Sequence, residues 1–180
     1  MRIKKENTVG LIIDIQEKLF PVMWEKEKLL KNCTTLIKGL EELSCPLVVT
    51  QQYTKGLGDT VGGIKEAVSA FKYIEKSAFS CCDEPTVINQ LKELGAKNVI
   101  ICGIESHVCV LQTAIDLKQA GFNPVVVMDC VSSRAQTSIE LAKERFRFEN
   151  IMMASYESIL FELTRTSGTP EFRAISKLVK

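Results

Sequence analysis

The chain has 180 residues, 46% of them hydrophobic and 25% charged, which fits one globular domain spanning residues 1–180. Its net charge of +1 creates no field that would attract nucleic acid or an anionic membrane, so neither is an expected partner. The first apolar run is short and broken by Asp14, and no stretch is long enough to cross a bilayer, so we expect a soluble protein of the cytoplasm.

Apolar, β-branched runs alternate with helical patterns along the chain. The predicted strands are residues 9–15, 46–50, 73–76, 98–102, 124–128 and 151–155. Apolar residues at helical spacing predict helices within residues 29–43, 87–94, 108–120, 134–146 and 170–180. Strands that are apolar throughout are buried on both faces, as in a parallel sheet covered by helices. We therefore expect a three-layer α/β/α fold with a doubly wound, Rossmann-like, mainly parallel sheet of six strands.

Polar residues at the ends of these strands are the candidates for chemistry. In a doubly wound sheet, ligands bind beyond the carboxyl ends of the strands, near the point where the strand order reverses. Asp14 interrupts the end of the first predicted strand, where an unpaired carboxylate would be costly to bury. A helix N-cap or an anchor for a loop explains this residue equally well from the sequence alone.

Cys109 follows a predicted strand and opens a predicted helix. At that position the helix dipole and the free backbone amides lower the pKa of a thiol, and the same amides can bind an oxyanion. We therefore expect a thiol pKa well below that of free cysteine. The alternative is an inert, packed residue, which is the expectation for Cys102. Seven cysteines without a Cys-x-x-Cys pair match neither a disulfide framework nor a zinc cage.

Lys76 and His107 are the remaining charged candidates. A lysine that ends a short strand is usually a solvated surface charge, but beside a thiolate its ammonium would stabilise the anion. His107, the only histidine, lies two residues before Cys109, and residues at that spacing do not share a helix face. We expect His107 at the edge of a pocket rather than in a Cys-His dyad, and a single histidine excludes a His-rich metal site.

Together these segments resemble the isochorismatase-like hydrolases, which carry an Asp after the first strand, a Lys before a Phe-Ser pair, and a Gly-Ile segment leading to a Cys. All three elements occur here in that order, and the resemblance covers essentially the whole chain. It implies a catalytic triad in which Asp14 takes the thiol proton, Cys109 attacks an electrophilic carbon and Lys76 stabilises the charges. It also implies a cis peptide between Ile104 and Glu105, with the amides of Glu105 and Cys109 forming an oxyanion hole.

The segment after the second predicted strand distinguishes members of this family. Nicotinamidases and pyrazinamidases carry an Asp and His metal cluster there, whereas residues 50–58 read Thr-Gln-Gln-Tyr-Thr-Lys-Gly-Leu-Gly. We therefore expect a site without metal or other cofactor. The segment is similar to that of the isochorismatase domain-containing proteins of unsettled substrate, which carry Glu and Pro in place of Gln51 and Thr54.

The expected partner is a small-molecule substrate. Its pocket is predicted to be lined by Phe20, Gln51, Gln52, Tyr53, Phe79 and His107. The glycines of residues 56–63 match neither Gly-x-Gly-x-x-Gly nor a P-loop, so we interpret them as a mobile pocket loop rather than a phosphate site. Because homo-oligomers are common among the relatives that the resemblance implies, we also expect a homo-oligomer, with residues 164–180 as a candidate contact.

Three functions are compatible with the sequence. The leading hypothesis is hydrolysis of a small amide, or a related carbon–nitrogen bond, through a covalent thioester-type intermediate on Cys109. The second is hydrolysis of a vinyl ether, as in isochorismate, which does not need the cysteine. The third is a non-catalytic interaction protein that retains the fold.

Overall fold

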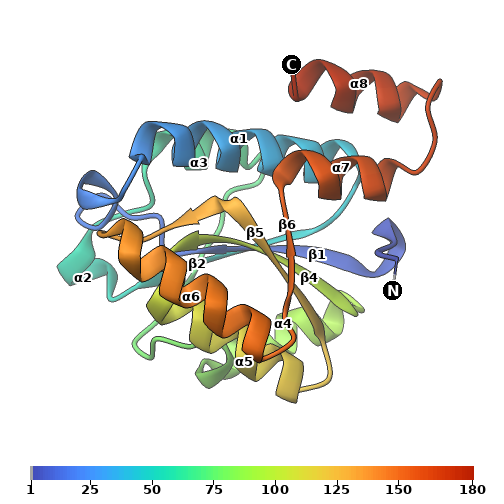
Figure 1. Ribbon diagram of the computed structural model, residues 1–180. Coiled ribbons are helices and arrows are strands. Elements are labelled where there is room, and N and C mark those ends of the chain that lie inside the picture. The colour runs from blue at the N-terminus through green and yellow to red at the C-terminus, as the bar shows by residue number, and fades with distance from the viewer. Residues whose placement is uncertain (1) are drawn as a thin grey trace.

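A computed structural model describes residues 2–180 and shows the expected alternation of strands and helices (Figure 1). The strands are β1 (Thr8–Ile13), β2 (Leu47–Gln52), β3 (Ile74–Lys76), β4 (Asn98–Ile104), β5 (Asn123–Ser132) and β6 (Met152–Ala154). They form one sheet in the order β3-β2-β1-β4-β5-β6, in which every neighbouring pair is parallel. The predicted doubly wound, six-stranded α/β sheet is therefore confirmed.

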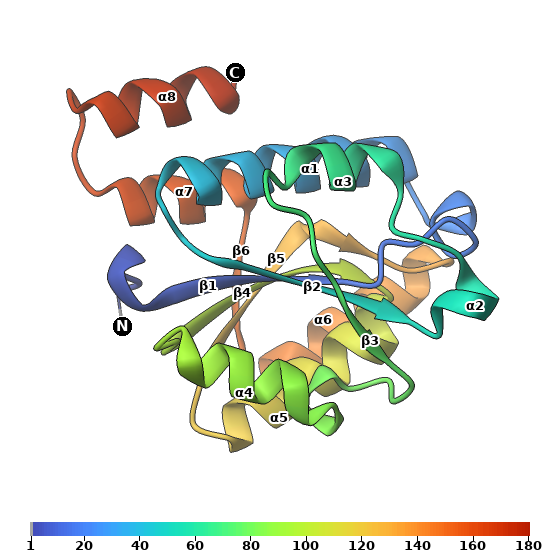
Figure 2. The ribbon, with the colours of Figure 1, turned by 180° about the vertical axis from the view of Figure 1, so that it is seen from behind.

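Helices cover both faces of the sheet (Figures 1 and 2). They are α1 (Lys26–Glu42), α2 (Thr54–Leu57), α3 (Gly62–Ala67), α4 (Pro85–Glu93), α5 (Leu111–Gln119), α6 (Gln136–Phe148), α7 (Tyr156–Thr164) and α8 (Pro170–Leu178). Helices α1, α3 and α7 lie on one face and α4, α5 and α6 on the other, while α8 packs outside α1 and α7. None of these helices within residues 2–180 is both long and apolar enough to span a bilayer.

Three helices were not predicted from the sequence. Helices α2 and α3 take up the two ends of the expected loop at residues 56–63, and Ile64 and Ala67 of α3 are buried in the core. Helix α7 begins at a capping box in which Ser155 and Ser158 satisfy each other's backbone amides. Helices α2 and α3 have only four and six residues, so their helical periodicity is weak in the sequence.

The sheet separates two apolar clusters, one under each helical layer. Along β1, Ile12 packs with the α1 side, whereas Leu11 and Ile13 pack with the side of α4, α5 and α6. This alternation explains why β1 is apolar throughout. The chain leaves β1 toward β2 and β3 and then returns to β4 on the other side of β1. The strand order therefore reverses between β1 and β4, which is where ligands bind in such sheets.

Gly103, the penultimate residue of β4, brings the ends of these two strands together. Its φ of +130° is a conformation that residues with a side chain rarely adopt. A Cβ atom at this position would lie 2.1 Å from the carbonyl oxygen of Ile13 in β1. Because glycine has no Cβ, the residues that follow β1 and β4 can meet at one place.

Candidate active site

Asp14 follows β1 directly and is completely buried. Its φ of 52° turns the chain immediately after the strand, a conformation that Asp tolerates better than most residues. Its Oδ1 accepts a hydrogen bond of 2.8 Å from Thr50 Oγ1 in β2, and its Oδ2 lies 2.7 Å from Lys76 Nζ in β3. Asp14 is thus a buried carboxylate contacted from two neighbouring strands, not a helix cap.

Lys76 is only 1% exposed, so the alternative of a solvated surface charge is wrong. Its ammonium donates to Gln52 Oε1 at 2.6 Å and to the carbonyl oxygens of Ala78 at 3.0 Å and Phe79 at 3.1 Å. These acceptors can engage all three N–H groups of the ammonium. Its interaction with Asp14 Oδ2 is therefore mainly electrostatic. Within residues 2–180, that oxygen has no hydrogen-bond partner of good geometry.

Cys109 lies in η4, a single π-helical turn (Ser106–Val110) that precedes α5. The sequence predicted an α-helix from residue 108, whereas here the carbonyl of Glu105 accepts the amides of both Val108 and Val110. Such turns are rare and often occur at functional sites. The peptide bond between Ile104 and Glu105 is cis, the geometry that the resemblance implies there.

The thiol of Cys109 is buried beside the carboxyl group of Asp14, within hydrogen-bonding reach. Burial raises its pKa to about 12, the negative charge of Asp14 contributes to the rise, and the charge of Lys76 offsets only part of it. The expected low thiol pKa is therefore wrong for the free protein. A helix end acts over one turn, and here desolvation and a neighbouring carboxylate outweigh it.

Asp14 and Lys76 also shift each other's pKa. Burial raises the pKa of Asp14, against the opposing charge of Lys76 and the hydrogen bonds that the carboxylate accepts. Burial by itself would lower the pKa of Lys76, but the charge of Asp14, with contributions from Cys81 and Cys109, raises it. The cluster is thus a carboxylate–ammonium pair beside a thiol that keeps its proton.

Gln52, which was predicted to contact substrate, is instead used inside the protein. Its Oε1 accepts from Lys76, and its Nε2 donates to the carbonyl oxygen of Ser77 at 2.6 Å. Buried Gln16, which sequence reasoning missed, binds both the backbone amide (2.7 Å) and the carbonyl (3.0 Å) of Gln52. A polar residue two positions after Asp14 was the only available signal. These amides position the ammonium of Lys76.

Gln51, which was predicted to line the pocket, is likewise bound within the protein. It is completely buried, and its Nε2 donates to Thr60 Oγ1 at 2.9 Å and to Asp59 Oδ1. Its Oε1 accepts from Thr54 Oγ1 at 2.9 Å. The side chain therefore connects β2 to the segment that carries α2 and α3.

The aromatic candidates and His107 lie around the cluster. Phe79 and Tyr53 are more than half exposed, and their backbones contact Lys76, through the carbonyl of Phe79 and the amide of Tyr53. Their rings remain candidate walls of a substrate pocket. Phe20 packs against the core on the α1 side. His107 Nδ1 lies 2.9 Å from Ser133 Oγ, a partner outside the cluster.

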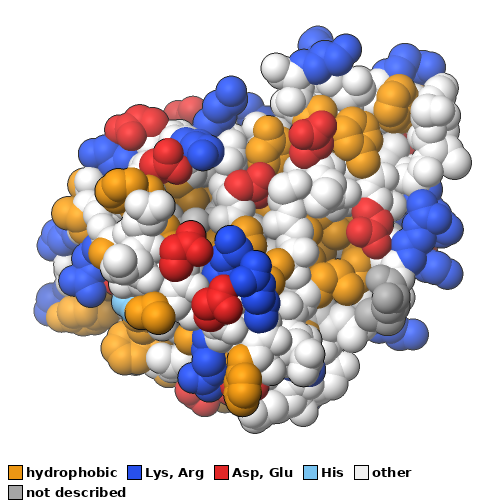
Figure 3. All heavy atoms as spheres, viewed as in Figure 1, with side chains coloured by type: hydrophobic (Ala, Val, Ile, Leu, Met, Phe, Trp, Pro, Cys, Tyr) orange, Lys and Arg blue, Asp and Glu red, His pale blue; other side chains and the backbone are white. Residues whose placement is uncertain are grey.

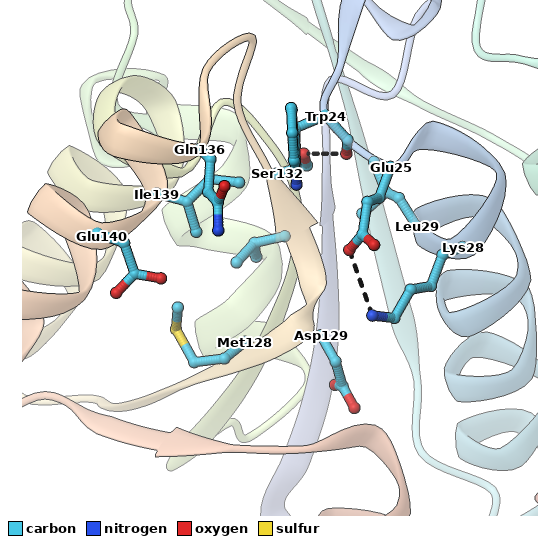
Figure 4. Close-up of a pocket in the computed structure, with 11 residues that line it drawn as sticks. Trp24, Glu25, Lys28, Leu29, Met128, Asp129, Ser132, Gln136, Ile139 and Glu140 are labelled. Carbon is cyan, nitrogen blue, oxygen red and sulfur yellow. Dashed lines mark hydrogen bonds and ion pairs between the residues drawn. The ribbon is translucent and has the colours of Figure 1, made fainter.

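A separate cavity of about 290 Å³ opens along β5, between α1 and α6 (Figure 4). Its walls include Trp24, Met128, Asp129, Ser132 and Gln136, and none of the three clustered candidates contributes to it. This cavity is therefore separate from the buried cluster of Asp14, Lys76 and Cys109. Within residues 2–180, no three His, Cys, Asp or Glu side chains are grouped as metal ligands.

Comparison with known proteins identifies relatives of this chain along nearly its whole length. A model of the isochorismatase domain matches residues 8–156. Isochorismatase domain-containing protein 2 of Danio rerio is 34% identical over 99% of this chain and 89% of its own length. A secreted isochorismatase effector of Phytophthora sojae is 36% identical over 99% of this chain and 87% of its own length.

Solved structures give the same result. The MAR1 ribonuclease of Caenorhabditis elegans is 37% identical with a TM-score of 0.93, covering 99% of this chain and 92% of that one. The YcaC gene product of Escherichia coli, described as an octameric hydrolase of unknown specificity, is 21% identical with a TM-score of 0.92, over 99% and 90% of the two chains, and shows the shared fold alone. The resemblance seen in the sequence motifs is confirmed, and the chain belongs to the isochorismatase family of hydrolases.

Proposed function

We propose that this protein hydrolyses a small-molecule amide, or a related carbon–nitrogen bond, through a covalent intermediate on Cys109. The observation that carries the proposal is Asp14 Oδ2. This oxygen lies 2.7 Å from the ammonium of Lys76, and its carboxyl group lies within hydrogen-bonding reach of the Cys109 thiol. An oxygen in that position can act as the general base for a thiol nucleophile.

The reaction begins when a carbonyl carbon reaches Cys109 Sγ. As the sulfur–carbon bond forms, the thiol proton moves to Asp14 Oδ2, and the π electrons of the carbonyl move to its oxygen. The backbone amides of Glu105 and Cys109 are proposed to bind that oxyanion. When the tetrahedral intermediate collapses, the carbon–nitrogen bond breaks, and the leaving nitrogen takes the proton from Asp14. The product of this half-reaction is a thioester on Cys109.

Water completes the cycle by attacking the thioester while Asp14 again accepts a proton. The acid is released, and the proton returns to the sulfur. Because the thiol pKa is about 12 in the free protein, proton transfer accompanies attack instead of preceding it. The charge of Lys76 works against the effect of burial on Asp14, so it keeps the carboxylate in the form that can accept the proton.

Two other reactions remain alternatives. Hydrolysis of a vinyl ether begins with protonation of carbon and needs no cysteine. RNA cleavage is suggested by the name of the Caenorhabditis elegans relative. The net charge of +1 gives little attraction for a phosphate backbone, and the single histidine is bound to Ser133. A non-catalytic interaction protein is the third alternative.

Intact-mass spectrometry after incubation with a library of metabolite amides tests the proposal. We expect a substrate-dependent acyl adduct on the wild-type chain, none on Cys109→Ala, and a loss of hydrolysis of at least about a thousandfold in that variant. Cys82→Ala, which removes a partly exposed thiol, should keep both the adduct and the activity. A matched incubation with EDTA should leave turnover unchanged.

The same assay separates the alternatives. An isochorismate-type vinyl ether and a short RNA are included in the panel. Turnover of either one that survives Cys109→Ala would overturn the cysteine mechanism in favour of that reaction. No adduct and no turnover of any compound in the panel would indicate a non-catalytic protein.

We also propose that the chain associates with copies of itself. The Escherichia coli structure is described as octameric, but its 21% identity carries only the fold, so the support must come from the surface of this chain. The cytoplasmic location stays a prediction, because the relative from Phytophthora sojae is named as secreted.

A further inference from the structure

The outer face of α6 exposes two large apolar side chains. Leu141 is 71% exposed and Phe148 is 79% exposed, more than any other large hydrophobic residue within residues 2–180. Seven residues make about two helical turns, so both side chains lie on the same side of the helix. The opposite side buries Ala142 and Phe146 in the core. Helix α6 is therefore anchored in the core by other residues than its outer apolar pair.

Two charged residues lie between Leu141 and Phe148 on the same face of α6, and these four residues form one stripe along the helix. Glu144 and Arg145 complete the i, i+3, i+4, i+7 pattern of one helix face. Their ion-pair partners lie on α6 or directly after it, since Glu144 contacts Arg147 and Arg145 Nη2 lies 2.9 Å from Glu149 Oε1. Figure 3 shows side chains of both charge signs gathered over this helix. Such exposed pairs are weak and can exchange partners.

The order of these four residues makes the face complementary to itself. Consider two copies of α6 packed antiparallel, about a two-fold axis midway between positions 144 and 145. Leu141 then meets the partner's Phe148, and Glu144 meets the partner's Arg145. Apolar residues contact apolar residues, and each charge contacts its opposite, as an isologous interface requires.

We propose that the outer face of α6 is the contact through which two copies of this chain form a homodimer. The proposal rests on the self-association proposed above and names its surface. Helix α6 packs against η4, the turn that carries Cys109, so the contact lies on the element behind the candidate nucleophile. Two turns of one helix make a small interface. The dimer is therefore weak and depends on concentration.

Sedimentation velocity over a concentration series tests this surface. Between about 1 μM and about 300 μM, the range in which small interfaces assemble, the wild-type chain should shift from monomer to dimer. Glu144→Arg places two arginines opposite each other and Arg145→Glu places two glutamates opposite each other, so each should weaken dimerisation at least tenfold. Lys143→Glu changes the charge equally but off the stripe, and it should dimerise like the wild type.

Mixing the two charge variants gives the sharpest readout. In a dimer of one Glu144→Arg chain and one Arg145→Glu chain, both cross-contacts again join opposite charges. The equimolar mixture, with one chain labelled by a mass tag, should therefore form heterodimers at concentrations where neither variant dimerises alone. A variant that merely misfolds cannot produce this rescue.

Each outcome separates the proposals. A wild-type chain that stays monomeric throughout would overturn both this surface and self-association, while leaving the Cys109 adduct untouched. Wild-type assembly that neither charge variant weakens would keep self-association and reject α6 as the contact. Loss of dimer in both variants without rescue in the mixture would reject the antiparallel pairing.

Discussion

The protein contains the same kind of ion pair in two very different surroundings. Lys76 and Asp14 meet at 2.7 Å with both side chains completely buried. Arg145 and Glu149, at the end of α6, meet at 2.9 Å with the arginine more than half exposed. The distances are nearly equal, but Coulomb interactions are several times stronger where protein replaces water. The two pairs therefore differ in what they can do.

Because the Asp14–Lys76 pair is buried, its charges act strongly on the groups around it. Neither charge can find a solvent partner, and the hydrogen bonds from Thr50 and to Gln52 fix where each charge lies. Beside the larger effect of burial, Asp14 raises the pKa of Cys109 and Lys76 lowers it. The exposed pairs of α6 are screened by water and salt, which leaves them free to exchange partners when another copy of the chain approaches.

The largest effect is expected when the buried pair is broken. Lys76→Met leaves the carboxylate of Asp14 buried without its cation and should lower the free energy of unfolding by about 3–5 kcal/mol. Urea denaturation measures this loss. The double variant Asp14→Asn/Lys76→Met, which removes both charges, should be more stable than Lys76→Met alone. If Lys76→Met lowers the free energy of unfolding by less than about 1 kcal/mol, the buried pair behaves like a surface pair. That result would contradict the claim that burial distinguishes the two pairs.

A second, more selective effect is expected from Asp14→Asn. Removing the carboxylate leaves the ammonium of Lys76 beside the thiol without an opposing charge, so the pKa of Cys109 should fall from about 12. One pKa unit changes the thiolate fraction tenfold. Alkylation of Cys109 by iodoacetamide at neutral pH should therefore be at least about tenfold faster than in the wild type, although hydrolysis is lost with the base.

The pH profile of that alkylation is the measurement. In the wild type, the rate should still rise above pH 10, because the thiol loses its proton only near pH 12. In Asp14→Asn the profile should move to lower pH, and circular dichroism checks that the fold is retained. Superimposable profiles would show that Asp14 does not act on the thiol.

The sheet and the three clustered residues were largely predictable from the sequence, for a local reason. Strands buried on both faces are apolar throughout, so Asp14 stands out at the end of one strand. Cys109 stood out by its position between a predicted strand and a predicted helix, whereas Lys76 gained its significance only as part of a family pattern, because a lysine after a short strand is usually a surface charge.

What the sequence could not predict depends on contacts between distant segments. Thr50 and Gln16 look like ordinary polar residues, but Thr50 donates to Asp14 and Gln16 binds the backbone of Gln52, each across 36 positions. The prediction of a low pKa for Cys109 was wrong for the same reason. The helix end is visible in the sequence, whereas the burial and the carboxylate that outweigh it come from the fold.

The smallest effect is expected from Glu149→Gln, which breaks the exposed pair with Arg145 while keeping the size of the side chain. The free energy of unfolding should fall by no more than about 0.5 kcal/mol, the usual contribution of an exposed pair at i, i+4. Urea denaturation in about 0.05 M and about 1 M salt should show the difference vanishing at the higher concentration, where the Debye length shrinks to about 3 Å. The cost of Lys76→Met should persist there, because ions do not enter the buried cluster. Equal sensitivity to salt at the two sites would mean that burial does not distinguish these pairs.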